Sequence, residues 1–540
     1  MKKYVGCLFV IILSLWSIRP LFGRGYFPMH DDTQVARVVV MGRALKDGQF
    51  PVRWVSDLGY GYGYPLFNFY GPLPYYTGGV LYAAGIDSVS ATKAMFAAGT
   101  LLSALSMYIL LFPYFGFLGA LTGSMLFLSA PYHAAQIYVR GSVGEYWAVA
   151  FIPLVLLGMY GKKPVIGSIG LAGVIASHAI LGYLTAVVLG ISAVVQIFRN
   201  HDTNALKIIA LGLGMSSFFW LPAWRELPYT SVSKMITGAS TAFFDHFVCL
   251  GQLWNSPWGF GGSAPGCVDG MSFKLGKVQI VTFLVACILM VFPWKRVKIH
   301  AKPLARIGTV IALVSIFLTL EFSETVWRIF PFTDFIQYPW RMLSFAAVGM
   351  AVSGAYAVSA WRIPLVRIGL TVIVVWGTIF LGVKIFQPQY VYDRRPSEFE
   401  SVSELRYRVS KISDEYMPTG FFRPATLKYT ASEPVDRTTG LGVAVEKDFA
   451  IYKRVSIDTP VPMSYTVRWN IAHFPGWTFF VNENKVKPEI NSALPYVTVP
   501  QGKSIIEARL TDTPIRTLAN FITIITVIII IFSYGKKTKA

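Results

Sequence analysis

Long apolar runs constrain this chain more than any other feature. A helix needs about 20 apolar residues to cross a bilayer, and roughly twelve runs of about that length recur along the chain. Only 14% of the residues are charged, against about 25% in soluble proteins. The chain is therefore predicted to be an α-helical polytopic membrane protein, which excludes a soluble globular enzyme and a disordered chain. The predicted spans are 4–22, 91–112, 116–134, 145–160, 164–178, 179–198, 205–223, 277–294, 303–321, 340–360, 364–386 and 517–534.

Two further runs need separate interpretation. The stretch Leu73–Ile86 is only about 14 residues long, which suits a re-entrant or interfacial helix better than a span. The N-terminal run resembles a signal peptide, but no small-x-small cleavage site follows it. We therefore interpret it as an uncleaved first span.

The positive charge has a simple explanation in topology. A net charge of +20 would suit a nucleic-acid partner if the basic residues gathered on a solvated domain. If 73–86 does not cross, however, sixteen basic residues and only one acid, Asp202, share one face. This positive-inside pattern predicts a multi-pass protein of the cytoplasmic (plasma) membrane with both termini cytoplasmic and no nucleic-acid partner. The basic residues are Lys2, Lys3, Lys162, Lys163, Arg199, Lys207, Lys295, Arg296, Lys298, Lys302, Arg306, Arg362, Arg367, Lys536, Lys537 and Lys539.

The same topology predicts the domain organisation. The alternating patterns of Ser464–Trp469 and Tyr496–Val499 are typical of strands, and turn signals lie at 482–484 and 500–502. We expect a transmembrane domain over 1–386 with an outer re-entrant loop at 23–90, an extracytoplasmic β-rich domain over 387–516, and a last transmembrane helix with a basic cytoplasmic tail over 517–540.

Two cysteines share one loop on the predicted outer side. Cys249 and Cys267 can pair if that loop faces an oxidising compartment, and the bond would stabilise the fold by roughly 3 kcal/mol. The sequence leaves open whether they do.

An acidic pair follows the first span. Carboxylates are costly near the low dielectric of a bilayer. One aspartate would suffice to cap a helix beginning near Val35, whereas the sequence here is His30-Asp31-Asp32. The alternatives are a helix cap and an active site. In the second case Asp31 and Asp32 are the catalytic candidates and His30 binds substrate.

Aromatic residues dominate the next outer segment. Residues 59–76 are rich in Tyr, Phe, Gly and Pro, a composition that suits a bilayer interface. This segment is either an interfacial anchor or a platform for a sugar or lipid headgroup. In the second case the binding candidates from this region are Arg53, Tyr64, Asn68 and Tyr70.

The remaining polar candidates occupy the outer ends of spans. They are Arg140, Glu145, His178, Gln337 and Arg341. Taken singly, each suits a headgroup anchor or a satisfied interfacial residue. An ion-coupled transporter would instead bury carboxylates near the midplane. The shared position therefore indicates a site at the membrane–water boundary, where a substrate with a lipid tail and a polar head would bind.

These motifs together resemble a known group of proteins. The acidic pair, the outer helix before span two and the many further spans resemble the GT-C fold of polyprenyl-phosphate-dependent glycosyltransferases. The His30–Asp32, 59–76 and 337–341 motifs are similar to those of bacterial and archaeal membrane proteins labelled 6-pyruvoyl-tetrahydropterin synthase-related. Three later motifs resemble those of YfhO-like proteins, namely Asp414–Pro418, Phe474–Trp477 and Thr513–Arg516.

The resemblance implies an inverting glycosyltransferase. The partners would be a membrane lipid, a polyprenyl-phosphate sugar donor, and a glycan, lipid or protein acceptor. Asp31 or Asp32 would be the general base, and Arg140, Arg341 or Arg53 would stabilise the leaving phosphate. The resemblance makes no cofactor certain and leaves metal dependence open; a divalent cation, Mg²⁺ or Mn²⁺, would be held by Asp31, Asp32 and Glu145. The alternatives are a non-catalytic transporter of lipid-linked glycans and an assembly protein that recruits partners through its β domain.

Overall fold

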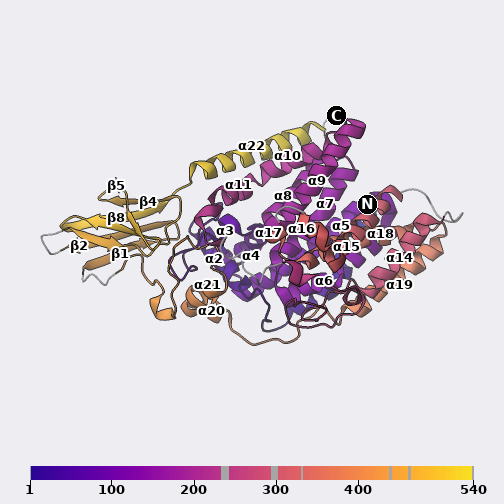
Figure 1. Ribbon diagram of the computed structural model, residues 1–540, viewed down its shortest axis with the longest axis horizontal. Helices are drawn as coiled ribbons and strands as arrows, with labels where there is room; N and C mark the ends of the chain where they lie inside the picture. The colour runs from indigo at the N-terminus through magenta and orange to yellow at the C-terminus, as the bar shows by residue number, and fades with distance from the viewer. Residues whose placement is uncertain are drawn as a thin grey trace. The chain divides into compact units, whose positions relative to one another are not determined.

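The computed structural model describes residues 2–232, 243–292, 302–329, 333–436, 441–459 and 464–537. It confirms the predicted class, a mostly helical chain with a C-terminal β-sheet region (Figure 1). Four of the basic residues used for the topology, Lys295, Arg296, Lys298 and Lys539, lie outside the described residues.

Eight helices in the described ranges are long and apolar enough to cross a membrane, or nine if α10 and the helix after it form one span. The chain is thus a multi-pass membrane protein. The prediction of about twelve spans differs because α5 joins two predicted spans and because α8 and α14 are shorter than the others. The eight are α1 with its following turn (Tyr4–Phe22), α5 (Ser88–Leu128), α7 (Val143–Tyr160), α9 (Ala179–Asn200), α15 (Lys302–Thr319), α18 with its preceding turn (Pro339–Ser359), α19 (Pro364–Gly382) and the apolar part of α22 (Pro514–Phe532).

The long helix α5 is two helices joined at a kink. Pro113 removes one backbone donor from the helical ladder, and Gly116 adopts φ 68° and ψ −172°, which is not helical. The two halves correspond to the predicted spans 91–112 and 116–134.

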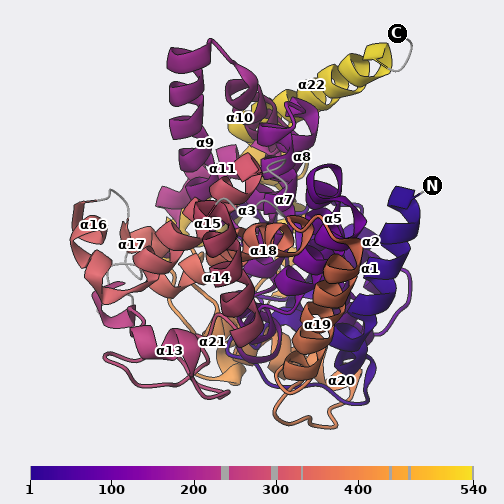
Figure 2. The same cartoon turned by 90° about the vertical axis from the view of Figure 1, so that its right-hand side faces the viewer.

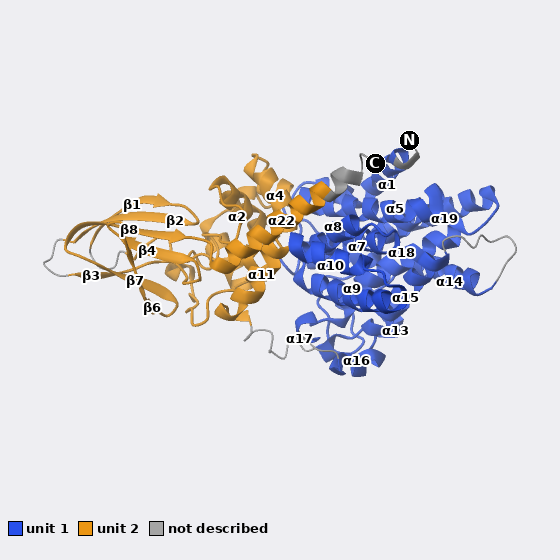
Figure 3. Cartoon of the chain, turned by 90° about the horizontal axis from the view of Figure 1, so that it is seen from above, with its two compact units in different colours: residues 1–32, 93–215, 237–393 blue, residues 33–92, 216–236, 394–540 orange. Residues whose placement is uncertain are grey.

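The chain divides into two compact units, each built from several segments (Figure 3). The first unit comprises 1–32, 93–215 and 237–393, and the second comprises 33–92, 216–236 and 394–540.

The first unit is a helical body (Figure 2). Its helix α18 (Leu343–Ser359) is buried along nearly its whole length, whereas α9 exposes apolar side chains such as Val188 and Ile191. This contrast is typical of a central helix and a lipid-facing helix. The other helices that begin or lie in this unit are α1 (Lys2–Ile18), α6 (Pro131–Ala135), α8 (Pro164–Ser177), α10 (Asn204–Met215), α13 (Leu250–Trp254), α14 (Lys277–Val291), α16 (Glu324–Ile329) and α17 (Thr333–Ile336).

Small residues allow close helix packing in the first unit. A Cβ at Gly158 of α7 would lie 2.2 Å from the Cα of Gly167 of α8, so these backbones touch as small residues permit in membrane helices. The unit also holds a disulfide between Cys249 and Cys267, whose Cα atoms are 5.6 Å apart.

The second unit combines short helices with β-sheets. The short predicted run 73–86 forms the eleven-residue helix α4. The helices of this unit are α2 (Gln34–Lys46), α3 (Leu66–Phe69), α4 (Leu73–Ala83), α11 (Ser217–Glu226), α20 (Pro396–Phe399), α21 (Ser410–Ile412) and α22 (Pro514–Lys537).

The sheets follow the alternation seen in the sequence. One sheet has the order β1-β2-β8-β4-β5 and the other the order β3-β7-β6. The predicted strands Ser464–Trp469 and Tyr496–Val499 become β3 and β7, which pair antiparallel with Tyr465 opposite Val499. The strands are β1 (Gly442–Asp448), β2 (Tyr452–Thr459), β3 (Tyr465–Arg468), β4 (Trp477–Val481), β5 (Asn484–Val486), β6 (Glu489–Asn491), β7 (Leu494–Val499) and β8 (Gly502–Leu510).

Candidate active site

A buried carboxylate organises the polar core of the first unit. Glu145, in the first turn of α7, is completely buried. Its Oε1 accepts hydrogen bonds from Tyr132 Oη at 2.7 Å and from Gln136 Nε2 at 3.0 Å, and its Oε2 accepts one from Arg140 Nη1 at 2.8 Å. A buried charge is tolerated only when it is paired and hydrogen-bonded, and Glu145 meets both conditions.

Two arginines share this one carboxylate. Arg341 Nε lies 3.7 Å from Glu145 Oε2, on the same oxygen that binds Arg140. Each guanidinium also packs over an aromatic ring, Arg140 over Trp340 at 4.5 Å and Arg341 over Tyr338 at 4.9 Å. Glu145 and the two arginines therefore carry a net positive charge, which would attract an anion.

The acidic pair begins beside these arginines. The backbone N–H of His30 donates to Val139 O at 3.0 Å, and that of Asp31 donates to Arg140 O at 2.9 Å. Residues 30–31 thus run alongside the π-helical turn Gln136–Arg140. Burial lowers the pKa of Arg140, but the nearby carboxylates of Glu145 and Asp31 outweigh it, and the net pKa is raised.

A glycine makes this close approach possible. Gly141 ends the π-helical turn with φ 68°, a conformation that costs other residues about 1 kcal/mol or more. A Cβ at this position would lie 2.2 Å from Met29 Sδ. Gly141 therefore sets the distance between residues 29–31 and the π-helical turn.

The side chains of the acidic motif remain accessible. Asp31 and Asp32 are partly exposed and His30 is exposed. The ring of His30 meets Phe260 edge-on, with 4.8 Å between centroids. Partial desolvation and the charge of Arg140 lower the pKa of His30, and Asp31 opposes the shift. His30 is thus biased toward its neutral form.

Two further predicted residues lie at the margin of this site. Gln337 Oε1 accepts a hydrogen bond from Arg341 Nη1 at 3.4 Å, and Gln337 has a φ of 66°. His178 precedes α9, where its Nδ1 accepts the backbone N–H of Leu181 at 3.3 Å. His178 therefore caps the N-terminus of α9. This contact fits the structural alternative given above, a satisfied residue at the end of a span.

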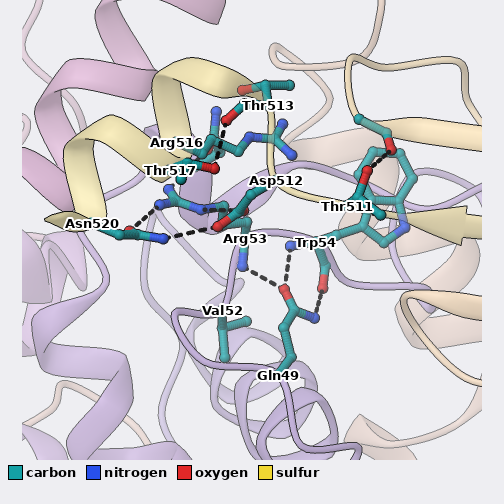
Figure 4. Close-up of polar contacts among 12 residues, drawn as sticks. Gln49, Val52, Arg53, Trp54, Thr511, Asp512, Thr513, Arg516, Thr517 and Asn520 are labelled. Atoms are coloured by element: carbon teal, nitrogen blue, oxygen red, sulfur yellow. Dashed lines mark hydrogen bonds and ion pairs between the residues drawn. The ribbon is translucent and has the colours of Figure 1, made fainter.

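The other predicted residues belong to the second unit. There Arg53 is almost completely buried, and its Nη1 donates to Asn68 Oδ1 at 3.2 Å. The Nη2 of Arg53 donates to Asn520 Oδ1 at 3.0 Å (Figure 4). Its Nε lies 3.7 Å from Asp512 Oδ1. Burial and the neighbouring Arg516 lower the pKa of Arg53 to about 10.

A second buried ion pair joins this network. Asn68 Nδ2 donates to Glu226 Oε2 at 2.8 Å, and Arg516 binds the same oxygen from Nε and Nη2 at 3.1 and 2.9 Å. Arg53 and Asn68 thus connect the segment 53–68 to α11 and α22 inside the second unit. These contacts are those of a structural network.

The remaining two tyrosines lie in an aromatic cluster of the second unit. Tyr64 is fully buried, and its hydroxyl accepts the backbone N–H of Tyr416 at 3.2 Å. Tyr70 is half-buried and carries the guanidinium of Arg37 over its ring at 3.9 Å.

Sequence reasoning missed several partners in both networks. One missed signal is a four-residue spacing, which places Tyr132, Gln136 and Arg140 on one helical face. This spacing could have indicated that Tyr132 and Gln136 lie beside Arg140 and contact Glu145. Glu226 gives no such signal, because its partner Arg516 is 290 residues away.

The donor set at Glu145 does not favour a metal ion. The described ranges hold no group of three His, Cys, Asp or Glu side chains placed as metal ligands. Glu145 already accepts three close hydrogen bonds beside two guanidinium groups, which would repel a divalent cation.

Comparison with known proteins gives one sequence relative, and no family model matches the chain. An uncharacterized protein of Lactococcus lactis subsp. cremoris (strain MG1363) is 26% identical over an alignment of 249 residues, and the match covers 42% of this chain and 41% of that protein. The match thus spans less than half the length of its curated relative.

Two solved structures are similar at low sequence identity. Arabinofuranosyltransferase AftD from Mycobacteria matches 73% of this chain and 28% of its own, with a TM-score of 0.46 and 12% identity. ArnT from Cupriavidus metallidurans, solved with undecaprenyl phosphate bound, matches 69% of this chain and 77% of its own, with a TM-score of 0.28 and 11% identity.

Proposed function

We propose that this chain is a membrane glycosyltransferase of the GT-C type, which moves a sugar from a polyprenyl-phosphate donor to a glycan, lipid or protein acceptor. The observation that carries the proposal is the position of Asp31. Its backbone N–H donates a hydrogen bond to the Arg140 carbonyl oxygen, and its carboxylate is partly exposed. The two positive charges of Arg140 and Arg341 are only half neutralised by the one negative charge of Glu145.

The geometry suits displacement at an anomeric carbon. Asp31, or its neighbour Asp32, accepts the proton of the acceptor hydroxyl as the new C–O bond forms. The bond between the anomeric carbon and the phosphate oxygen breaks on the opposite face, its electron pair stays on the phosphate, and the configuration inverts. Arg140 and Arg341 stabilise the charge of the leaving polyprenyl phosphate. No step needs a metal ion.

The proposal includes a sidedness. We propose that this site and the β-sheet region lie on the extracytoplasmic face, with both termini cytoplasmic, and the charge pattern of the sequence supports this orientation. The pairing of Cys249 with Cys267 supports this orientation, because disulfides persist in oxidising compartments.

The test is transfer of a radiolabelled sugar from polyprenyl phosphate in membranes that contain the full chain. Asp31→Asn and Asp32→Asn are compared with Asp202→Asn, a control in the predicted cytoplasmic loop at equal expression. We expect one of the first two to lose at least about 100-fold in rate, as removal of a general base does, and the control to retain full transfer. Full transfer by both site variants would refute the assignment of the base. Movement of the intact lipid-linked sugar without bond cleavage would show a transporter.

A further inference from the structure

Two adjacent carboxylates of the Asp414–Pro418 motif have different surroundings. Asp414 is buried and accepts hydrogen bonds from Tyr60 Oη at 2.9 Å and Arg423 Nε at 2.5 Å. Glu415 is half-buried, and its carboxylate accepts hydrogen bonds from the Ser413 hydroxyl at 3.2 and 3.1 Å and from its own backbone N–H. A carboxylate can accept about four hydrogen bonds. Asp414 thus forms a direct ion pair with Arg423, whereas Glu415 is joined to its cation, Arg37, through the Ser413 hydroxyl, and both of its oxygens can accept further hydrogen bonds.

A buried arginine lies on the other side of Ser413. Arg37 is 5% exposed, and its Nη2 donates to Ser413 Oγ at 3.0 Å, while its Nη1 donates to Tyr75 Oη at 3.4 Å. A guanidinium carries five N–H donors, so some remain for another acceptor. The Ser413 hydroxyl therefore bridges a cation and an anion, and both have hydrogen-bonding capacity beyond it.

Fixed aromatic rings surround this pair. The ring of Tyr416 stacks on Phe69 with 5.1 Å between centroids and 16° between planes. The guanidinium carbon of Arg37 lies over the ring of Tyr70, 3.9 Å from the ring centroid. Tyr70 and Tyr416 are both half-buried, so packing fixes each ring while part of it stays accessible. Rigid aromatic groups of this kind bind ligands at little cost in side-chain entropy.

We propose that Arg37, Glu415, Tyr70 and Tyr416 form a saccharide-binding subsite. The Glu415 carboxylate would accept hydrogen bonds from two neighbouring sugar hydroxyls, Arg37 would donate to a sugar oxygen, and the tyrosine rings would pack against the apolar C–H face. Such a mixture of apolar lining and few polar groups is typical of small-ligand sites. That the saccharide is the glycosyl acceptor rests on the function proposed above.

The electrostatics agree with a site built for a ligand. Burial raises the pKa of Glu415, and the attraction of Arg37 only partly offsets this. A carboxylate whose charged form is disfavoured by burial lowers the stability of the fold. Such perturbed groups are common at functional sites. A purely structural ion pair would be in direct contact, as Asp414 and Arg423 are.

Binding to the detergent-solubilised full chain tests the subsite directly. Saturation-transfer NMR with maltotriose, mannotriose and arabinotriose would report contact of each sugar with the protein. We expect Glu415→Gln and Tyr416→Ala to weaken binding about tenfold, the effect of losing one good polar or stacking contact. Tyr416→Phe keeps the ring and should bind as the parent does. Glu489→Gln, on the exposed strand β6, is the matched control.

The outcomes separate this proposal from the enzymatic one. Absence of saturation transfer to all three sugars, or equal binding by Glu415→Gln, overturns the subsite. Thermal unfolding of each variant identifies a general loss of fold, and if Tyr416→Ala does not fold, Glu415→Gln against the parent decides the outcome. Retained sugar binding without any sugar transfer overturns the glycosyltransferase and leaves the subsite standing.

Discussion

Arg516 holds Glu226 with two hydrogen bonds to one carboxylate oxygen, from Nε at 3.1 Å and from Nη2 at 2.9 Å, and both side chains are about 2% exposed. Removal of one partner of a buried pair leaves an uncompensated charge and costs about 3–5 kcal/mol, whereas removal of both costs much less. Arg516→Met alone should therefore destabilise the chain more than Arg516→Met combined with Glu226→Gln. Urea or thermal unfolding in detergent measures both single variants and the double variant; a double loss equal to the sum of the two single losses would show that the two residues are not coupled.

Glu145 should behave as the anchor of two arginines. Glu145→Gln preserves the shape but leaves Arg140 and Arg341 without their shared counter-charge, so we expect a loss of about 3–5 kcal/mol. The control is Glu324→Gln, which breaks an exposed pair with Arg328 and should cost less than about 1 kcal/mol. Similar melting temperatures for the two variants would contradict this account of Glu145.

Gly141 should be sensitive to a single added methyl group. Gly141→Ala introduces a Cβ that would meet Met29 Sδ at 2.2 Å and strains a φ of 68°. We expect a loss of about 1–3 kcal/mol and a marked decrease in sugar transfer, because residues 29–31 must shift. Gly190→Ala, where the new Cβ meets nothing within 4 Å, should leave both quantities unchanged or raise the stability slightly.

Glu415 should make the stability depend on pH. Its pKa is raised above 4.5 in the folded chain, so the folded state holds this proton more tightly than the unfolded state. The resulting stabilisation is complete below about pH 4.5 and disappears as pH rises through the raised pKa. Glu415→Gln cannot ionise and should therefore gain stability relative to the parent as pH rises. Parallel stability curves for parent and variant would show that the carboxylate is not the cause.

The disulfide should contribute measurably to the first unit. Cys249 and Cys267 close a loop with a sequence separation of 18, for which the entropy of the unfolded chain predicts about 3 kcal/mol. Replacing both cysteines with serine should lower the melting temperature of the untreated protein. The same double variant should be insensitive to a reductant that lowers the melting temperature of the parent.

Local sequence patterns predicted the architecture well. The reason is that the period of hydrophobic residues and the length of an apolar run can be read from a few neighbouring residues. The run Leu73–Ile86 was too short to cross and forms the short helix α4, and the turn signal at 482–484 separates β4 from β5. Asp31, Arg140, Glu145 and Arg341 were predicted to share one face, and the first unit brings them together.

Partners far apart in the sequence escaped prediction. Arg53 was one of three arginines proposed for the leaving phosphate, and the bond from its Nη2 to Asn520, which is 467 residues away, was not foreseen. Nothing in the local composition of either segment indicates the other. The order of helices in the chain also gave no sign that the second unit is assembled from three separated segments.

That assembly has a consequence for the order of events during synthesis. Asn68 and Glu226 leave the ribosome long before Arg516, the residue that completes their buried network. Domains usually fold as soon as their chain is available, but the second unit must wait until almost the whole chain has been made. A nascent chain truncated before Arg516 would keep Glu226 without its counter-charge, and proteolytic quality control could recognise this state.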